Sequence, residues 1–141
     1  MIDDLINDLK RDEGLKLSAY QDHLGFWTIG YGRLIDGRRG GGISKEEAEY
    51  FLKNDVDDVV SALRVKLDFW NDLPQNVKRA LCNMAFQLGI NGLLGFKNSL
   101  EFIKRGDWKN AGINLRKSKW YKQTPVRAER VIKMIEGAGK K

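Results

Sequence analysis

The chain has 141 residues and a formal net charge of +6 at pH 7; 42% of its residues are hydrophobic and 31% are charged. This composition is ordinary for a globular protein, and the length allows one domain or two small lobes with a buried core. The single cysteine, Cys82, excludes an intramolecular disulfide and a cysteine-built zinc site, and its apolar neighbours predict a buried thiol. No apolar run approaches the about 20 residues that cross a bilayer. The positive charge favours an anionic partner such as nucleic acid, a membrane surface or a cell-wall polymer.

The N-terminal segment predicts an amphipathic helix. Asp3 or Asp4 can cap its start, and Gly14 is a stop signal, which places Glu13 at the helix C-terminus. The first residues are acidic, whereas a secretory signal needs positive charge followed by an apolar run. We therefore expect synthesis in the cytosol without a built-in export signal.

A β-hairpin is predicted next. Segment 20–31 is rich in aromatic and β-branched residues and is interrupted by a turn that contains glycine. This pattern puts Asp22 after the first strand and Thr28 on the second. The glycine-rich residues 36–42 predict a loop that leads to a third short strand at Ile43.

The rest of the sequence predicts helices. Ser44 and Glu47 form a capping box before a long amphipathic helix, which we interpret as the spine that joins a β-containing lobe to a helical lobe. Further start signals are Pro74, Asp107 and Pro125. The predicted core is Leu5, Ile6, Leu81, Phe86, Leu100, Ile103, Trp108, Leu115, Trp120, Val131 and Ile135.

The acids and the hydroxyl of the first 32 residues carry a resemblance. Hydrolysis of a glycosidic bond requires at least two acidic side chains, which two rigid elements can hold facing each other across a cleft. Glu13, Asp22 and Thr28, followed by Ile29-Gly30-Tyr31-Gly32, are spaced as in the catalytic signature of the phage-type lysozymes (glycoside hydrolase family 24), which this chain resembles. Segments 46–49, 54–57, 83–87, 95–100 and 118–125 also resemble that family in order, so that nearly the whole chain is covered.

The resemblance implies a fold. It is α+β and mainly α, with a small lobe that contains the β-hairpin, a long linking helix and a helical C-terminal lobe. Residues 1–141 would form one lysozyme domain. Within it, residues 14–62 would make the small lobe with the linking helix, and residues 1–13 and 63–141 the helical lobe.

The resemblance also implies an activity. The chain would be an endolysin, a muramidase that hydrolyses the β-1,4 bond between N-acetylmuramic acid and N-acetylglucosamine in peptidoglycan. Glu13 would be the general acid, enclosed between the lobes, while Asp22 and Thr28 would hold the attacking water for an inverting reaction. Inversion implies carboxyl groups about 6.5–9.5 Å apart. No cofactor and no metal are implied.

Further residues match the family's saccharide contacts. The substrate-binding set would be Leu34, Phe86, Ser99 and Asn114, although Phe86 could equally belong to the core. Gln87 lies close to this set in sequence, and Arg127 matches an arginine that neighbours the catalytic glutamate in the family.

The family's biology supplies the expected partners and location. Peptidoglycan is the expected partner, with contact to an anionic wall or membrane surface and without nucleic acid, and the protein is expected to be a monomer. It would act in host cell lysis and phage release, leaving the host bacterial cytoplasm through a holin-type pore.

Two departures from the family stand out. Arg33 replaces a histidine that pairs, in a family member, with an aspartate matching Asp55, and we therefore predict an Arg33–Asp55 ion pair. The glycine loop is also shorter than the corresponding stretch.

Three alternatives to hydrolysis remain open from sequence. A lytic transglycosylase uses one acid and no water, and Asp22 and Thr28 argue against it. A membrane-disrupting or nucleic-acid-binding basic protein could use the amphipathic segment 127–134. A catalytically silent wall-binding relative is the third, and the presence of all three catalytic residue types argues against it.

Overall fold

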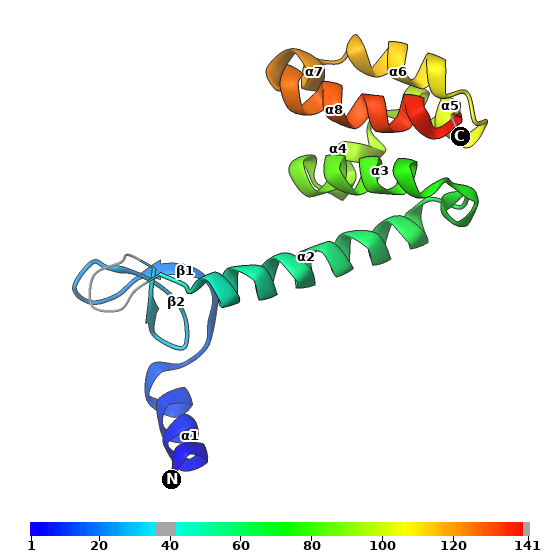
Figure 1. The fold of residues 1–141 in the computed structure, drawn as a ribbon. Helices are drawn as coiled ribbons and strands as arrows, with labels where there is room; N and C mark the ends of the chain where they lie inside the picture. The colour runs from blue at the N-terminus through cyan, green and yellow to red at the C-terminus, as the bar shows by residue number, and fades with distance from the viewer. Residues whose placement is uncertain (36–41, 140–141) are drawn as a thin grey trace. The chain divides into compact units, whose positions relative to one another are not determined.

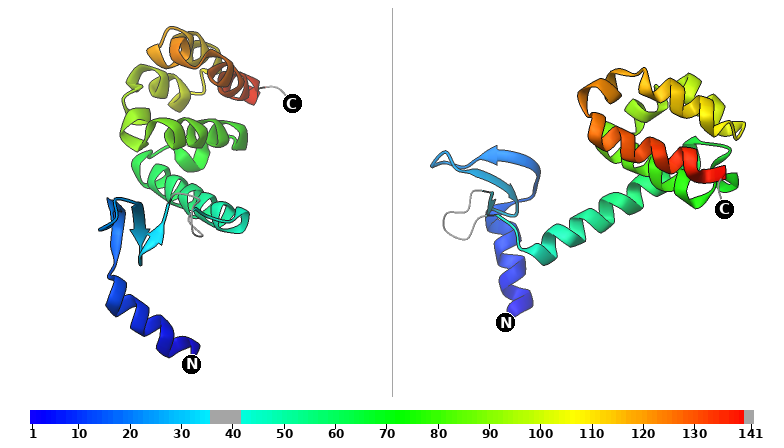
Figure 2. Two further views of the ribbon diagram at one scale, coloured as in Figure 1. Left: turned by 90° about the vertical axis from the view of Figure 1, so that its left-hand side faces the viewer. Right: turned by 45° about the horizontal axis from the view of Figure 1, so that its top comes forward.

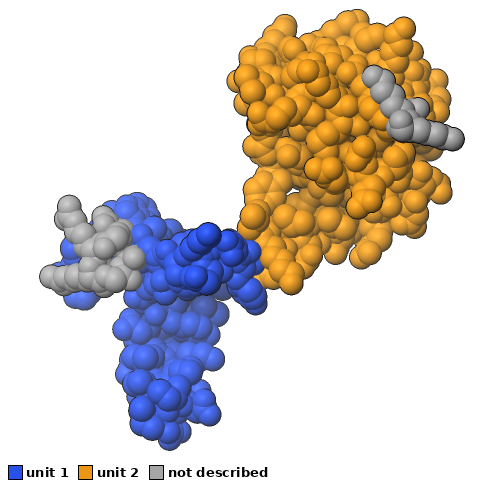
Figure 3. All heavy atoms as spheres, in the orientation of Figure 1, with its two compact units in different colours: residues 1–51 blue, residues 52–141 orange. Residues whose placement is uncertain are grey.

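The computed structural model describes residues 1–35 and 42–139, which form parts of two compact units, Met1–Phe51 and Leu52–Lys141 (Figure 3). Most of the loop predicted at 36–42 lies outside the described residues. The predicted division put residues 1–13 with the helical lobe and ended the small lobe at residue 62, and that division stays a prediction.

The first unit begins with helix α1, Ile2–Glu13, which ends where the sequence predicted because Gly14 follows it with φ 69°. The N-cap, however, is Met1 without a side-chain hydrogen bond. The capping role predicted for Asp3 or Asp4 is therefore wrong, and both carboxylates lie in the first turn, where they oppose the positive end of the helix dipole.

The apolar residues of α1 do not join the core. Leu5 and Ile6, which we predicted to be buried, are 45% and 44% exposed. The buried hydrophobic cluster is drawn from residues 63–135, and α1 buries none of its residues. Amphipathic spacing predicted which residues share a face, but it could not say whether that face is covered.

A three-stranded antiparallel sheet follows α1, with strands β1, β2 and β3 in chain order; β1 and β2 are labelled in Figure 1. Their bounds are Lys16–Gln21, Trp27–Gly30 and Arg33–Leu34. The third strand predicted at Ile43 is wrong, since β3 precedes the loop. Gly32 makes this possible because its φ of 70° allows the chain to turn back directly after β2.

The long helix α2, Lys45–Lys66, starts at the predicted capping box. The amide of Glu47 donates to the Ser44 hydroxyl, and Glu47 Oε1 accepts from the Ser44 amide at 2.9 Å. These hydrogen bonds, aided by the charge of Arg33, lower the pKa of the Glu47 carboxyl. Residues 45–51 of α2 belong to the first unit and residues 52–66 to the second.

Arg33 does not have the partner that we predicted. Its guanidinium lies 3.1 Å from Glu47 Oε1 and also donates to the carbonyl of Gly42, so the pair is Arg33–Glu47 rather than Arg33–Asp55. The capping box explains the difference, because it already holds the Glu47 carboxylate at the helix start, beside the carbonyl that Arg33 reaches.

Helices make up the rest of the second unit, and α8 packs against α3, α6 and α7 (Figures 1 and 2). Asp107 and Ser118 cap α6 and α7 through their side chains, and Pro125 opens α8. The bounds are η2 Trp70–Asp72, α3 Gln75–Leu88, α4 Ile90–Leu94, α5 Lys97–Lys104, α6 Trp108–Arg116, α7 Lys119–Gln123, α8 Pro125–Glu136 and η3 Gly137–Gly139.

The core lies among these helices and confirms most of its predicted members. Buried as predicted are Leu81, Leu100, Ile103, Leu115, Trp120, Val131 and Ile135. Trp108 is half-buried against the core, whereas Phe86 is 46% exposed and its predicted place in the core is wrong. Cys82 is half-buried rather than fully buried.

The buried face of α8 bears on the membrane alternative. Val131, Ile132 and Ile135 are the apolar residues that a membrane-binding helix would need to expose, and all three lie in the core. Within the described part of the chain, no helix is long and apolar enough to cross a membrane.

An ionic cluster ties α6 to α8. Arg116 donates to Glu129 at 2.7 Å and to Glu136 at 2.6 Å, and the Tyr121 hydroxyl donates to Glu129 at 2.9 Å. Hydrogen bonds from Arg116 and Tyr121 lower the pKa of Glu129 to about 2. Gly112 leaves the space that the Glu136 carboxyl occupies, because a β-carbon there would clash with it.

Candidate active site

Glu13 is the last residue of α1, and its carboxyl lies close to Gly32 in the turn between β2 and β3. A β-carbon built on Gly32 would stand 2.6 Å from Cδ of Glu13, which is closer than real contacts allow. Only glycine therefore lets the carboxyl lie where it does. In the sequence, Gly32 is part of the catalytic signature, but nothing there predicts its closeness to the Glu13 carboxyl.

Asp22 follows β1 and is held by the hairpin turn. Its Oδ1 accepts hydrogen bonds from the amides of Leu24 and Phe26, each at 2.9 Å. Among residues 1–35 and 42–139, Oδ2 accepts no hydrogen bond. One oxygen thus fixes the carboxylate, while the other remains able to bind water or substrate.

Thr28 lies on β2 and is linked to Asp22 through one carbonyl. The Phe26 oxygen accepts from the Asp22 amide at 2.8 Å and from the Thr28 hydroxyl at 3.0 Å. Thr28 is only 2% exposed, so this hydrogen bond satisfies a buried hydroxyl. Sequence reasoning did not foresee the Phe26 carbonyl, and strand spacing offered no signal for it, since a backbone atom carries no residue type.

Leu34 pairs with Thr28 across β2 and β3 and is half-buried. Cross-strand partners place their side chains on the same sheet face. The first unit thus contains four of the predicted site residues, Glu13, Asp22, Thr28 and Leu34. Thr28 and Leu34 are also paired across neighbouring strands.

The other predicted substrate contacts lie in the second unit. The Asn114 amide on α6 donates to the buried Ser99 hydroxyl on α5 at 2.7 Å. Both residues line a pocket of about 260 Å³, with Lys97 and Lys117 among its other lining residues. This pocket offers hydrogen-bonding groups and positive charge together.

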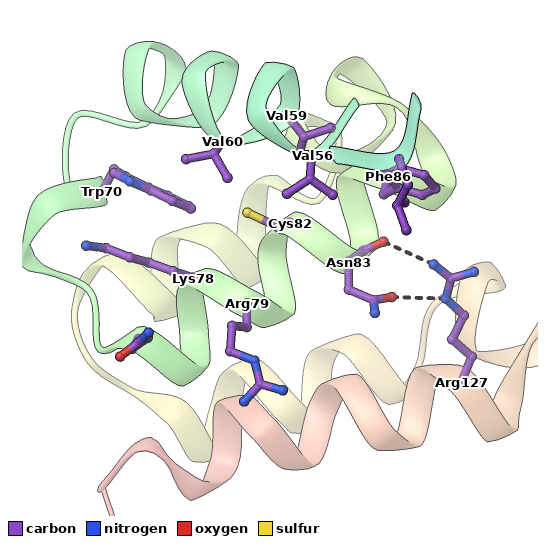
Figure 4. Close-up of a pocket in the computed structure, with 12 residues that line it drawn as sticks. Val56, Val59, Val60, Trp70, Lys78, Arg79, Cys82, Asn83, Phe86 and Arg127 are labelled. Carbon is purple, nitrogen blue, oxygen red and sulfur yellow. Dashed lines mark hydrogen bonds between the residues drawn. The ribbon is translucent and has the colours of Figure 1, made fainter. Parts of the chain in front are cut away.

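Phe86 lines a larger pocket of about 610 Å³ in the second unit (Figure 4). Valines of α2 and Trp70 supply apolar surface, and Lys78, Arg79 and Arg127 supply charge. The Cys82 thiol also lines it, and partial burial raises the pKa of that thiol.

Arg127 and Gln87 each have defined partners. Arg127 Nε donates to the side chain of Asn83 at 3.0 Å, a link drawn in Figure 4. Gln87 accepts from the Trp120 indole at 3.0 Å and donates to the Thr124 hydroxyl at 3.4 Å. Asn83 was not singled out from sequence, although it lies in a segment that carries the family resemblance.

Metal ligands do not cluster in the described residues: no group of three or more His, Cys, Asp or Glu side chains there is placed to hold an ion.

Comparison with known proteins decides the family. The family model described as Phage lysozyme matches residues 10–135. The chain belongs to the phage lysozyme family. It is accordingly a hydrolase of the glycosidase type, in a family of peptidoglycan-hydrolysing lysozymes.

Individual relatives span most of this lysozyme. "Probable T4-type lysozyme 2" of Dictyostelium discoideum is 33% identical over 162 residues, covering 96% of this chain and 95% of the relative. "Endolysin" of Acyrthosiphon pisum secondary endosymbiont phage 1 is 34% identical over 114 residues, or 81% of this chain and 75% of the relative. "Pre-baseplate central spike protein Gp5" of Enterobacteria phage T4 is 34% identical over 90% of this chain but only 26% of its own length.

Proposed function

We propose that this lysozyme is an endolysin-type muramidase that cleaves the β-1,4 bond between N-acetylmuramic acid and N-acetylglucosamine with inversion. The observation that carries the proposal is the link between Asp22 and Thr28 through the Phe26 carbonyl, in the unit that also holds Glu13. An inverting hydrolase needs a carboxylate and a second polar group that hold one water molecule, together with a separate acid.

Glu13 is the proposed general acid. It protonates the glycosidic oxygen as the bond to the anomeric carbon breaks. The glycine at position 32 supports this role because a β-carbon there would displace the Glu13 carboxyl from its place.

Asp22 and Thr28 are proposed to position and deprotonate the attacking water. The two amide hydrogen bonds to Oδ1 fix the carboxylate, and Oδ2 can accept the water's proton. Thr28 donates to the Phe26 carbonyl, and its oxygen can accept a hydrogen bond from the same water.

Leu34, Phe86, Ser99 and Asn114 are proposed to bind the glycan. The Ser99–Asn114 pair offers directional groups for an acetamido or hydroxyl group, and half-exposed Phe86 offers an apolar surface for a sugar ring. Arg127 and Gln87 are proposed to support this set through their hydrogen bonds to Asn83, Trp120 and Thr124.

The proposed biological role comes from the family and not from the chemistry of the site. We propose that a monomer acts on the host's peptidoglycan from within, after a holin-type pore gives it passage, for lysis and phage release. The net charge of +6 suits contact with an anionic wall or membrane surface.

The test compares wild type with Glu13→Gln and Asp22→Ala on chloroform-treated Gram-negative cells, following loss of turbidity. Both variants should lose at least about 10²-fold in rate because each removes an acid or base group. Mass analysis of the muropeptides should give reducing ends; anhydro sugars would indicate a transglycosylase instead. Killing that survives Glu13→Gln would point to the membrane-active alternative.

A further inference from the structure

One row of side chains runs across the sheet of the first unit. Tyr20 on β1 pairs with Thr28 on β2, and Thr28 pairs with Leu34 on β3. Side chains of directly paired residues lie on the same face, about 4.5–5.5 Å apart at their β-carbons. Tyr20, Thr28 and Leu34 therefore form a continuous row.

Asp22 extends the same face. It lies two residues after Tyr20, and its amide continues the strand ladder by donating to the Phe26 carbonyl at 2.8 Å. Residues two apart along a strand share a face. The face that holds the proposed water-binding pair thus also holds an aromatic ring, which the proposed function leaves without a role.

The opposite face is distinct. Gln21 pairs with Trp27. Because successive residues of a strand lie on opposite faces, this pair lies on the face opposite to Tyr20 and Thr28. A change in register between Lys16 and Tyr20 precedes this pairing, and irregularities of this kind often re-aim side chains beside functional sites. Tyr20 is half-buried, so part of the residue is available to a ligand.

We infer that Tyr20 is a further saccharide contact, presenting its ring to the sugar whose linkage Asp22 and Thr28 attack. This inference rests on the proposed function. Tyrosine suits the task because it supplies a rigid, large contact area with two side-chain torsions, so little conformational entropy is lost on binding. Tyr20 then contributes to the affinity for glycan, while Asp22 and Thr28 supply the chemistry.

The experiment measures binding apart from turnover. Glu13→Gln serves as the parent, and its co-sedimentation with purified peptidoglycan gives an affinity. Tyr20→Leu is the main variant because leucine keeps the apolar bulk and favours folding but has no ring. Tyr20→Phe keeps the ring. Gln21→Ala is the matched control, one residue away on the opposite face.

Tyr20→Leu should bind about tenfold more weakly than the parent, and Tyr20→Phe and Gln21→Ala within about twofold of it. In the otherwise wild-type enzyme, Tyr20→Leu should raise KM more than it lowers kcat. Three results would each overturn the ring contact. Folded Tyr20→Leu could bind peptidoglycan as tightly as the parent, or Gln21→Ala or Tyr20→Phe could lose as much affinity as Tyr20→Leu. Failure of the proposed function would look different, since Glu13→Gln would then keep its lytic activity.

Discussion

The carboxyl group of Glu13 lies over the backbone of Gly32, closer than any residue with a β-carbon would allow. The contact joins the end of α1 to the turn between β2 and β3. Position 32 therefore controls where the proposed acid can stand, although it carries no functional group.

Gly32→Ala should reduce lytic activity by more than its loss of stability explains. The methyl group would displace the Glu13 carboxyl, and the φ of 70° would add about 1–2 kcal/mol of backbone strain. Gly106→Ala is the matched control, because its φ is 74° and its new β-carbon would meet only an ordinary contact, 3.9 Å from Trp108. The melting temperatures of both variants should fall by similar amounts, and only Gly32→Ala should lose lytic activity. Equal lytic activities of the two variants would refute the role of this contact.

Thr28→Val should lower kcat by about 10²-fold with little change in KM. Valine keeps the shape and the strand preference of threonine but cannot hydrogen-bond to water. Thr28→Ser, which keeps the hydroxyl, should retain most of the rate. Steady-state kinetics on soluble glycan fragments check this, and a Thr28→Val enzyme at wild-type kcat would remove Thr28 from the mechanism.

Ser99→Ala should raise KM while changing the free energy of unfolding by no more than about 1 kcal/mol. The substitution removes one hydrogen bond, and the half-buried Asn114 amide that loses its partner can bind water instead. Asn110→Ala is the control on α6, since it removes an amide that bonds Asp107 at the helix start. It should lower stability without raising KM; a KM increase in both variants would mean that the effect is not local to the Ser99–Asn114 pair.

Glu129→Gln should weaken the dependence of stability on acid pH. Arg116 and Tyr121 lower the pKa of Glu129 to about 2, so the unfolded chain binds this proton at higher pH than the folded one. The stabilisation is complete above the ordinary carboxyl pKa and is lost as pH falls toward 2. Melting temperatures between pH 6 and pH 2 should therefore fall more steeply for wild type than for Glu129→Gln.

Glu101→Gln is the control for that series, because it removes the same charge from an exposed residue paired with Arg105 at 3.9 Å. Its melting temperature should fall with pH as steeply as that of wild type. An equally steep fall for wild type and Glu129→Gln would show that the ionised Glu129 carboxylate does not stabilise the fold.

Features that depend on residues within about one helical turn of each other could be predicted from the sequence. The capping box of Ser44 and Glu47, the Asp107 cap and the stop at Gly14 all depend on hydrogen bonds or φ angles among residues at most four apart. Predictions that needed a partner from another element were less secure. Arg33 found Glu47 rather than Asp55, and the third strand formed at Arg33–Leu34 rather than at Ile43.

The amino-acid sequence by itself determined the longer helices and the hairpin, the residue types at positions 13, 22 and 28, and most of the core, but not the short helices α4 and α7. These follow from periodicity and from local backbone chemistry, and the spacing of the three residues carried the family resemblance. Only the tertiary structure decided that the Glu13 carboxyl rests on Gly32 and that one carbonyl joins Asp22 to Thr28. Such contacts depend on how separate elements meet in space, and the positions of residues along the chain do not specify that meeting.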